Sequence, residues 1–386
     1  MQKTQIVAKL VKTKLMRYRL SVFFVAAAFF AACNAPSPKD LPRAQASPEL
    51  EAGFSEMMDS VVASFSDMTN WQRIVNLHSI MIVKDGKVVK EKYFGEWTPD
   101  KPHSMFSVSK TFTAAAVGIA IHEGRMALTD KVADYFPEKQ VEGNPCDATV
   151  EDLLMMAGGH ENDPTLEVLE MDINARSSYI KEGAEIADTF FKYPFVCKPG
   201  ELFVYNSAGT YLLSAIVTKV TGESVLDYLT TRLFEPLGIE KPVWEADKYG
   251  ITAGGWGLEL KTEDMAKMGQ LLLQKGKWGR KQLIPAKWVE AMSEKHIDCA
   301  PAQVRIEDSE RVTGVPDAQN DWRQGYGYQV WRCKTPGCYR ADGAGGQYIL
   351  VLPPKNAVVV MTSWTGNLQR ELDFVWEYIY LIYRPL

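Results

Sequence analysis

The stretch Met-Phe-Ser-Val-Ser-Lys-Thr-Phe-Thr-Ala-Ala-Ala-Val occupies residues 105–117. Ser107 and Lys110 stand three residues apart at the start of an alanine-rich helical pattern, so their side chains share one helix face. A serine hydroxyl is a weak nucleophile until a neighbouring base takes its proton, and a lysine serves where its surroundings disfavour the ammonium form. The start of a helix also points backbone N–H groups toward a developing oxyanion. We therefore predict that Ser107 is a nucleophile and that Lys110 shares in proton transfer.

The spacing alone does not identify a catalytic pair. Ser178 and Lys181 have the same spacing, and a solvated serine and lysine near a helix start are the common explanation of such a pair. Ser107 follows two apolar residues and opens an alanine-rich helix, whereas Ser178 lies among polar and charged residues. The surroundings therefore favour the pair at residues 107 and 110.

The sequence pattern around this helix changes twice along the chain. From residue 111 to about residue 250 the apolar spacing is mainly helical, with glycines where helices are expected to end. Strand-like patterns lie on both sides of this region, at residues 79–83, 88–94, 325–331, 347–352 and 357–364. The first two flank Asp85-Gly86, a typical hairpin turn. This order predicts an α/β fold of the α+β type, with an antiparallel sheet built from both chain ends, flanked by helices, and a helical insertion.

The N-terminus has the pattern of an export signal. Six basic residues precede the apolar run at residues 22–32, which is too short to span a bilayer and ends at Cys33. Residues 30–33, Phe-Ala-Ala-Cys, resemble a bacterial lipobox, so we predict a lipoprotein signal at residues 1–33 and lipid attachment at Cys33. An ordinary secretory signal is the alternative. The proline-containing residues 34–49 predict a flexible tether, and residues 50–386 a folded domain, held at the membrane on the periplasmic or cell-surface side.

Composition narrows the choice of partners. The net charge is −5, which does not provide the basic surface that nucleic-acid binding requires, so nucleic acid is not an expected partner. The five histidines show no HExxH motif or paired spacing, and no cysteines form a CxxC motif, so neither a metal site nor a cofactor is predicted.

The cysteines beyond residue 33 are five in number, so at least one is expected to stay unpaired. Cys333 and Cys338 flank a Pro-Gly turn, which favours a disulfide closing a hairpin. Cys146 and Cys197 are candidates for a second pair, although the sequence does not decide the connectivity.

Several ordered motifs carry a family resemblance. After Phe-Ser-Val-Ser-Lys at residues 106–110 come Lys-Val-Ala-Asp-Tyr-Phe-Pro at 131–137, Thr-Val-Glu-Asp-Leu-Leu at 149–154 and Lys-Pro-Gly-Glu at 198–201. This series resembles the class C beta-lactamase and penicillin-binding-protein superfamily of serine hydrolases, from about Leu77 to Trp364. The resemblance implies a serine beta-lactamase-like fold with an all-helical subdomain, an acyl-enzyme on the serine, and no cofactor.

The family's second motif, Tyr-x-Asn, corresponds to Tyr205-Asn206-Ser207. The resemblance implies that Tyr205 shares the proton with the lysine and passes it to the leaving group. An aromatic ring that merely packs at a helix start is the alternative. Ser207 replaces the usual asparagine, a departure similar to some esterase and aminohexanoate-oligomer hydrolase members, and is a candidate substrate contact.

The family's third motif, Lys-Thr-Gly or His-Thr-Gly, is best matched by Gly-Ala-Gly-Gly-Gln-Tyr at residues 343–348. Lys334-Thr335-Pro336 is a weaker match because it lies between the two cysteines. The match places Ala344 where relatives have a cation and implies that the backbone N–H groups of Ser107 and Gln347 form the oxyanion hole. Gly345 and Gly346 are candidate substrate-binding residues; glycines that only begin a strand are the alternative.

These motifs predict a serine hydrolase acting on small esters or linear amides. A true beta-lactamase or D-alanyl-D-alanine carboxypeptidase is the first alternative, and a lipoprotein that binds or senses without turnover is the second. Both substrates of the first alternative carry a carboxylate, which the missing cation disfavours. Arg340 is a candidate to replace that cation.

Overall fold

The computed structural model describes residues 40–64, 75–165, 186–299 and 315–383. The predicted signal segment with Cys33 lies outside these residues, as does Ser178. Among the helices of the described part, none combines the length and the apolar character needed to cross a membrane.

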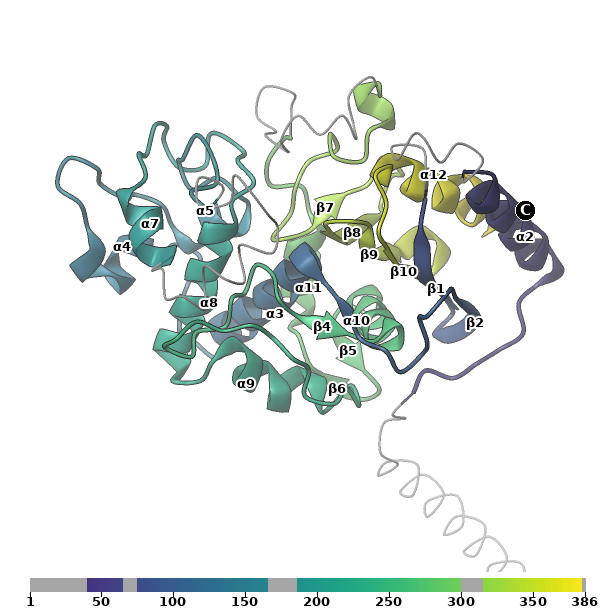
Figure 1. Ribbon diagram of the computed structural model, residues 1–386. Coiled ribbons are helices and arrows are strands. Elements are labelled where there is room, and N and C mark those ends of the chain that lie inside the picture. The colour runs from purple at the N-terminus through teal and green to yellow at the C-terminus, as the bar shows by residue number, and fades with distance from the viewer. Residues whose placement is uncertain (1–39, 65–74, 166–185, 300–314, 384–386) are drawn as a thin grey trace, which may run out of the picture. The chain divides into compact units, whose positions relative to one another are not determined.

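One antiparallel sheet of six strands organises the molecule, in the order β2-β1-β10-β9-β8-β7 (Figure 1). The strands are β1 (Leu77–Lys84), β2 (Lys87–Tyr93), β7 (Trp331–Arg332), β8 (Tyr339–Gly343), β9 (Gln347–Leu352) and β10 (Ala357–Ser363). Asp85 and Gly86 join β1 to β2 with φ values of 50° and 74°, as a type I′ turn requires. Because β1 pairs with β10, both ends of the chain build the sheet, and this part of the fold prediction is confirmed.

Alternate residues of the strands face two separate cores. On one face Ile80 and Ile82 pack with helices α2 (Pro48–Ser64) and α12 (Leu368–Tyr378), which lie against each other. On the other face Met81 and Val83 belong to the core that contains α10 (Thr262–Leu273) and the helical region. Gly269 of α10 comes so close to β9 and β10 that a Cβ there would lie 2.5 Å from Val358. The sheet is thus the middle layer between two sets of helices.

The region predicted as a helical insertion holds a group of helices. It contains α3 (Ser109–His122), α4 (Val132–Tyr135), α5 (Val150–Leu154), α7 (Ile186–Lys192), α8 (Ser207–Thr221) and α9 (Val225–Leu229). Helix α8 ends at Gly222, whose φ of 77° is the left-handed cap conformation that favours glycine. Helix α3 is almost entirely buried, and it begins beside the ends of β8 and β9. The start of α3 therefore lies where the helical region meets the sheet.

Residues 41–44, which the sequence assigns to a flexible tether, are held on the folded domain. Leu41 is buried in the core, and Ala44 donates a backbone hydrogen bond of 2.8 Å to Val88 of β2. Arg43 forms an ion pair of 2.7 Å with Glu263. An apolar side chain and an ion pair thus fix residues 41–44 on the folded domain, and α2 begins at Pro48, so the boundary predicted at residue 49 is wrong.

Candidate functional site

Ser107 and Lys110 meet at the start of α3, as the sequence predicts. Ser107 lies in the 3₁₀ turn Phe106–Val108, and Lys110 lies in the first turn of the helix. Lys110 Nζ is 3.1 Å from Ser107 Oγ, and the lysine is only 1 % exposed. Phe106 has a φ of 45°, a conformation that costs energy in a bulky residue and often occurs at functional sites. Ser109 Oγ stabilises this turn by donating to the Phe106 carbonyl at 2.6 Å.

The Lys110 amine contacts two further oxygen atoms. Nζ donates to Gly255 O at 2.9 Å and to Ser207 Oγ at 3.2 Å. A Cβ at residue 255 would lie 3.4 Å from Nζ, so this backbone segment packs directly against the amine. Sequence reasoning predicted a substrate contact for Ser207 and did not find Gly255, although the glycine pair at residues 254–255 was a visible signal.

Tyr205 lies beside the same amine. Lys110 Nζ is 4.9 Å from the centroid of the Tyr205 ring. The ring stacks on Trp331 of β7 with centroids 5.7 Å apart and planes 20° apart, so the sheet edge fixes its orientation. One cluster is therefore formed by four residues from the start of α3 and the 3₁₀ turn before it, and from the start of α8 and the loop before it: Ser107, Lys110, Tyr205 and Ser207.

Buried polar groups hold the start of α8 in place. The Asp163 carboxylate, 3 % exposed, accepts the Ser207 backbone N–H at 2.7 Å, and it also accepts from the Thr165 backbone and hydroxyl. Asn206 caps the helix by accepting from Gly209 N at 2.9 Å, and its Nδ2 donates to His160 Nδ1 at 3.1 Å. Nothing in the sequence distinguished Asp163 from other loop acids, and reasoning from sequence missed it.

His160 is neutral in this arrangement. Its Nε2 lies 3.0 Å from the Phe190 carbonyl, which can only accept, so Nε2 carries the hydrogen and Nδ1 accepts from Asn206. Burial lowers the pKa of His160 to about 4. Protonation would give Nδ1 a hydrogen directed at the Asn206 amide, so this histidine supports the helix start only in its neutral form.

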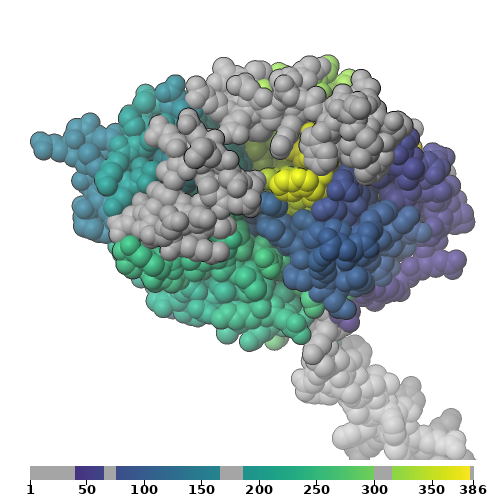
Figure 2. All heavy atoms as spheres, viewed as in Figure 1, coloured from purple at the N-terminus to yellow at the C-terminus, as the bar shows by residue number. Residues whose placement is uncertain are grey.

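The glycine turn between β8 and β9 lies near Ser107. A Cβ at Gly343 would be 2.4 Å from the Met105 carbonyl, and a Cβ at Gly345 would be 2.6 Å from the exposed ring of Trp364. The Trp364 ring lies 5.9 Å from that of Phe106, next to the nucleophile. Figure 2 shows atoms of the last part of the chain, in yellow, at the floor of a hollow between the green helical region and blue residues of the early strands.

The predicted role of Gln347 uses its backbone N–H, and its side chain is held by backbone carbonyls. The residue is fully buried, and its Nε2 donates to Ser363 O at 2.8 Å and to Ala344 O at 3.0 Å. An N–H group that serves an oxyanion hole must reach the bound substrate. The role of Gln347 stays a prediction, and its complete burial counts against it; Ala344, in the same turn, is partly exposed.

Arg340 does not replace the missing cation, and that hypothesis is wrong. Its side chain is 0 % exposed, pairs with Asp342 at 2.9 Å and lies over the Trp322 ring at 4.7 Å. Lys334 pairs with Asp373 across the sheet edge. A substrate carboxylate in the hollow therefore cannot reach the Arg340 guanidinium.

The five described cysteines are all unbridged, so the disulfides considered for Cys333 with Cys338 and for Cys146 with Cys197 are absent from the structure. Burial raises the pKa of Cys146 to about 11, which makes this thiol unreactive at neutral pH. Among the described residues, no group of three or more histidine, cysteine or acidic side chains is placed to hold a metal ion.

Comparison with known proteins places these motifs in a family. The family described as Beta-lactamase matches residues 77–382. A 6-aminohexanoate-dimer hydrolase of Paenarthrobacter ureafaciens is 27 % identical over 321 residues, covering 80 % of this chain and 78 % of the relative. Penicillin-binding protein 4 of Amycolatopsis lactamdurans is 30 % identical over 305 residues, covering 71 % of this chain and 77 % of the relative.

Solved structures share the fold. A family VIII carboxylesterase superimposes with a TM-score of 0.64 at 17 % identity, covering 88 % of this chain and 99 % of the other. An octameric penicillin-binding protein homologue from Pyrococcus abyssi gives a TM-score of 0.63 at 22 % identity, covering 85 % of this chain and 77 % of the other. At such identities the likeness concerns the fold alone.

Proposed function

The chain belongs to the beta-lactamase family of serine hydrolases, and from this premise we propose that it cleaves esters or linear amides through an acyl-enzyme on Ser107. The observation that carries the proposal is the buried amine of Lys110, 3.1 Å from the Ser107 hydroxyl. The name of the 6-aminohexanoate-dimer hydrolase describes a dimer of an amino acid, which is an amide, as its substrate, and that of the family VIII carboxylesterase an ester. These names support the same substrate classes here.

The contacts of Lys110 suit the transfer of a proton. A neutral amine has two N–H groups and one lone pair. Gly255 O and Ser207 Oγ lie where they accept the two N–H groups, which leaves the lone pair for the Ser107 hydroxyl. As Ser107 Oγ bonds to the substrate carbonyl carbon, its proton passes to Lys110 and Tyr205.

Tyr205 then protonates the departing alcohol or amine, and the bond to the leaving group breaks. A water molecule attacks the acyl carbon next and gives a proton back to the Lys110–Tyr205 pair. As the bond to Ser107 breaks, the pair passes that proton to Ser107 Oγ, the acid leaves, and the enzyme returns to its starting state. The backbone N–H of Ser107, at the start of α3, would stabilise the oxyanion in both steps.

The residues around the nucleophile favour uncharged, apolar acyl groups. Trp364, which is 43 % exposed, and Phe106 present aromatic rings beside Ser107. Arg340, the candidate partner for a substrate carboxylate, is buried in its own ion pair. A charge-assisted hydrogen bond contributes about 1.5–3 kcal/mol, so its loss would weaken carboxylate substrates roughly tenfold to a hundredfold.

A substrate panel tests this proposal. The measurement is kcat/KM for a short-chain p-nitrophenyl ester, a linear aminohexanoate dimer, nitrocefin and a D-Ala-D-Ala peptide. We expect the first two to exceed the others. The similarity to a penicillin-binding protein supports the rival activity, and a clearly higher value for nitrocefin or the peptide would establish it. If no substrate turns over and a fluorophosphonate does not label Ser107, the chain is a binding or sensor protein.

We also propose that the protein is an exported lipoprotein, attached through Cys33 to a membrane on the periplasmic or cell-surface side. The basic segment, the apolar run and the lipobox-like Phe-Ala-Ala-Cys support this proposal. Two or more acyl chains would give stable attachment, whereas one is marginal. Cys33→Ala should release the protein from membranes or leave its signal uncleaved. Mass spectrometry that finds another mature N-terminus without lipid would overturn the proposal.

A further inference from the structure

A hydroxyl group supports the glycine turn from the sheet. Ser363, the last residue of β10, is fully buried, and its Oγ lies 2.8 Å from Gly345 O and 3.1 Å from Gly346 O. The same Oγ lies 3.0 Å from Oε2 of Glu371 on α12. Three oxygen atoms, two from the glycine turn and one from α12, thus surround one hydroxyl.

The number of protons around Ser363 constrains the state of Glu371. A serine hydroxyl carries one hydrogen, so it can donate fully to one of these three oxygen atoms. Carbonyl oxygens only accept, and an ionised carboxylate only accepts as well. A second hydrogen is needed for a favourable contact between Ser363 and Glu371. The group that can carry it is the Glu371 carboxyl, which would then donate to Ser363 Oγ while Ser363 donates to Gly345 O.

The surroundings of Glu371 agree with a neutral carboxyl. The residue is 0 % exposed, and among the described residues its Oε1 has no hydrogen-bond partner. An ionised carboxylate in such a place would be costly. Burial raises the pKa of Glu371 well above its ordinary value, and the nearby Asp342 adds to the increase. The titratable groups that face Glu371 are Asp342 of β8 and the phenol of Tyr348 on β9, and neither is a cation.

The turn rests directly on these two side chains. A Cβ at Gly346 would lie 2.0 Å from Ser363 Oγ and 2.2 Å from Glu371 Oε2, so only a glycine fits there. The φ of 99° at Gly346 also favours glycine. On its other side the turn adjoins Ser107, because Gly343 meets the Met105 carbonyl and Gly345 meets Trp364 beside Phe106.

We propose that Glu371 is a positioning residue that stays protonated in the folded protein and, through Ser363, holds the glycine turn in the orientation that substrate binding at Ser107 requires. The activity part of this inference rests on the proposed hydrolase function; the protonation part does not. Glu371 lies beneath the turn and does not touch the substrate.

Three variants test the positioning role. Glu371→Gln keeps the size of the side chain and supplies an N–H donor to Ser363, so kcat should stay within about threefold of wild type. Glu371→Ala and Ser363→Ala remove the support, and each should lower kcat by about tenfold to a hundredfold with a smaller change in KM. Their effects should not add in the double variant. Glu377→Gln, on the exposed side of α12, is the matched control and should change nothing.

Stability and infrared measurements test the proton independently of activity. Because the folded state keeps a proton on Glu371 that the unfolded state releases above about pH 4.5, the contribution of this residue to stability falls as the pH rises. The Glu371→Gln variant lacks this loss, so its advantage in Tm should grow between about pH 5 and about pH 8. Wild type should also show the infrared carbonyl band of a protonated carboxylic acid, which Glu371→Gln removes.

The outcomes separate the two claims. A constant Tm difference together with an absent infrared band would show an ionised Glu371 and overturn the inference. A folded Glu371→Gln variant as inactive as Glu371→Ala would overturn the positioning role. If wild type hydrolyses no substrate, the proposed function fails, while the Tm and infrared results still decide whether Glu371 is protonated.

Discussion

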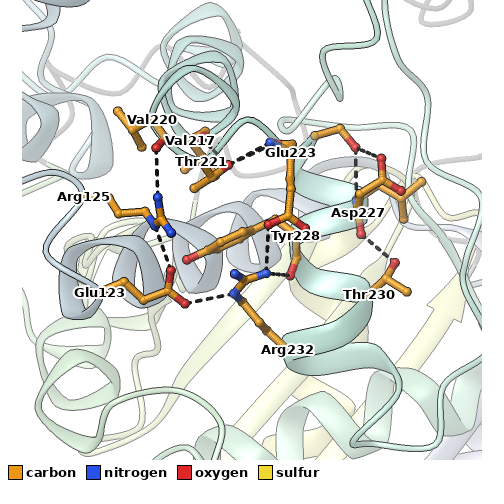
Figure 3. Close-up of polar contacts among 12 residues, drawn as sticks. Glu123, Arg125, Val217, Val220, Thr221, Glu223, Asp227, Tyr228, Thr230 and Arg232 are labelled. Atoms are coloured by element: carbon orange, nitrogen blue, oxygen red, sulfur yellow. Dashed lines mark hydrogen bonds and ion pairs between the residues drawn. The ribbon is translucent and has the colours of Figure 1, made fainter.

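The charged residues at the two ends of helix α3 lie in opposite surroundings, one buried and one near the surface. At its start, Lys110 is buried, and its amine lies within hydrogen-bond distance of the oxygens of Ser107, Ser207 and Gly255. At its end, Glu123 lies near the surface and accepts from Arg232 at 2.9 Å and from Arg125 at 3.0 Å (Figure 3). Burial raises the pKa of Glu123, but the two arginine hydrogen bonds outweigh it and lower the pKa overall.

The start of α3 therefore carries the proposed catalytic residues, whereas its end carries ion pairs that stabilise the fold. Arg232 also bonds Glu223 at 3.2 Å and lies 3.9 Å from the centroid of the Tyr228 ring, so the surface network joins the ends of α3 and α8 to α9. Each charge there has an oppositely charged neighbour and access to water. Burying the Lys110 amine costs desolvation energy. At this end of the helix the charged residue therefore serves the proposed proton transfer and does not stabilise the fold. Changes at the two ends should therefore have different consequences.

The largest effect is expected at the nucleophile. Ser107→Ala removes the atom that forms the acyl-enzyme, so hydrolysis of a p-nitrophenyl ester should fall by about a thousandfold or more. The control is Ser178→Ala, at the second site with the same spacing, which should keep full activity. Full activity in the Ser107 variant would contradict the whole assignment.

Lys110→Met should separate activity from stability most clearly. Methionine fills a similar volume without an amine, so kcat/KM should fall by about a hundredfold to ten-thousandfold while Tm stays equal or rises. Assays of hydrolysis and thermal unfolding on the same preparation decide the matter. A large fall in Tm would mean that Lys110 stabilises the fold and would contradict the proposed division of roles along the helix.

Asp163→Asn should have an intermediate effect on both properties. It removes the negative charge that accepts the Ser207 backbone N–H, and a lost charged hydrogen bond should lower the unfolding free energy by about 1.5–3 kcal/mol. Because Ser207 contacts Lys110, kcat should also fall, by about tenfold. Denaturant unfolding and ester kinetics measure the two parts. An unchanged kcat would limit Asp163 to a structural role.

Acid should destabilise the start of α8 through His160. The pKa of His160 in the folded protein, about 4 because of burial, lies below its ordinary value of 6.5. The unfolded state therefore takes up the proton first, and the stability present above about pH 6.5 is lost as the pH falls toward 4. His78, whose pKa burial also lowers to about 4, acts in the same direction. Tm should thus fall in acid for wild type and less for His160→Gln; equal slopes would contradict the role of His160.

Arg232→Ala should have the smallest effect. The pairs it loses are partly exposed, so the unfolding free energy should fall by about 1 kcal/mol, and less in high salt. Ester hydrolysis should stay within about twofold of wild type. A large loss of activity would show that the surface network controls the distant start of the helix.

Local patterns in the sequence made much of this architecture predictable. The Asp85-Gly86 hairpin, the strand Gln347–Leu352 and the meeting of Ser107 with Lys110 follow from spacing within one element. Strand β8 was missed because Arg340 and Asp342 look like exposed residues, whereas they pair with each other in the interior. The buried aromatic Trp322 over the guanidinium, which makes this arrangement favourable, comes from another part of the chain.

The parts of the site that could not be predicted depend on tertiary contacts. The Gly255 carbonyl reaches Lys110 across 145 positions, and a carbonyl group has no side-chain signature. Glu371 and Ser363 become significant only because α12 packs against the far side of the turn. Sequence spacing shows which side chains share a helix or strand. It does not show which residues of other helices and strands pack against them.

The pairing of β1 with β10 has a consequence for the order of folding. Ser79 on β1 bonds Thr362 on β10, 283 positions away, so the central strand pair cannot form until nearly the whole chain has been synthesised. Contacts this distant slow folding, because a long loop must close before they contribute. Strand β1 therefore cannot pair with β10 until β10 has been synthesised. Loss of the C-terminal strand would leave the N-terminal hairpin without its partner, and a chain stopped near residue 350 could build the nucleophile's helix but not the sheet against which it rests.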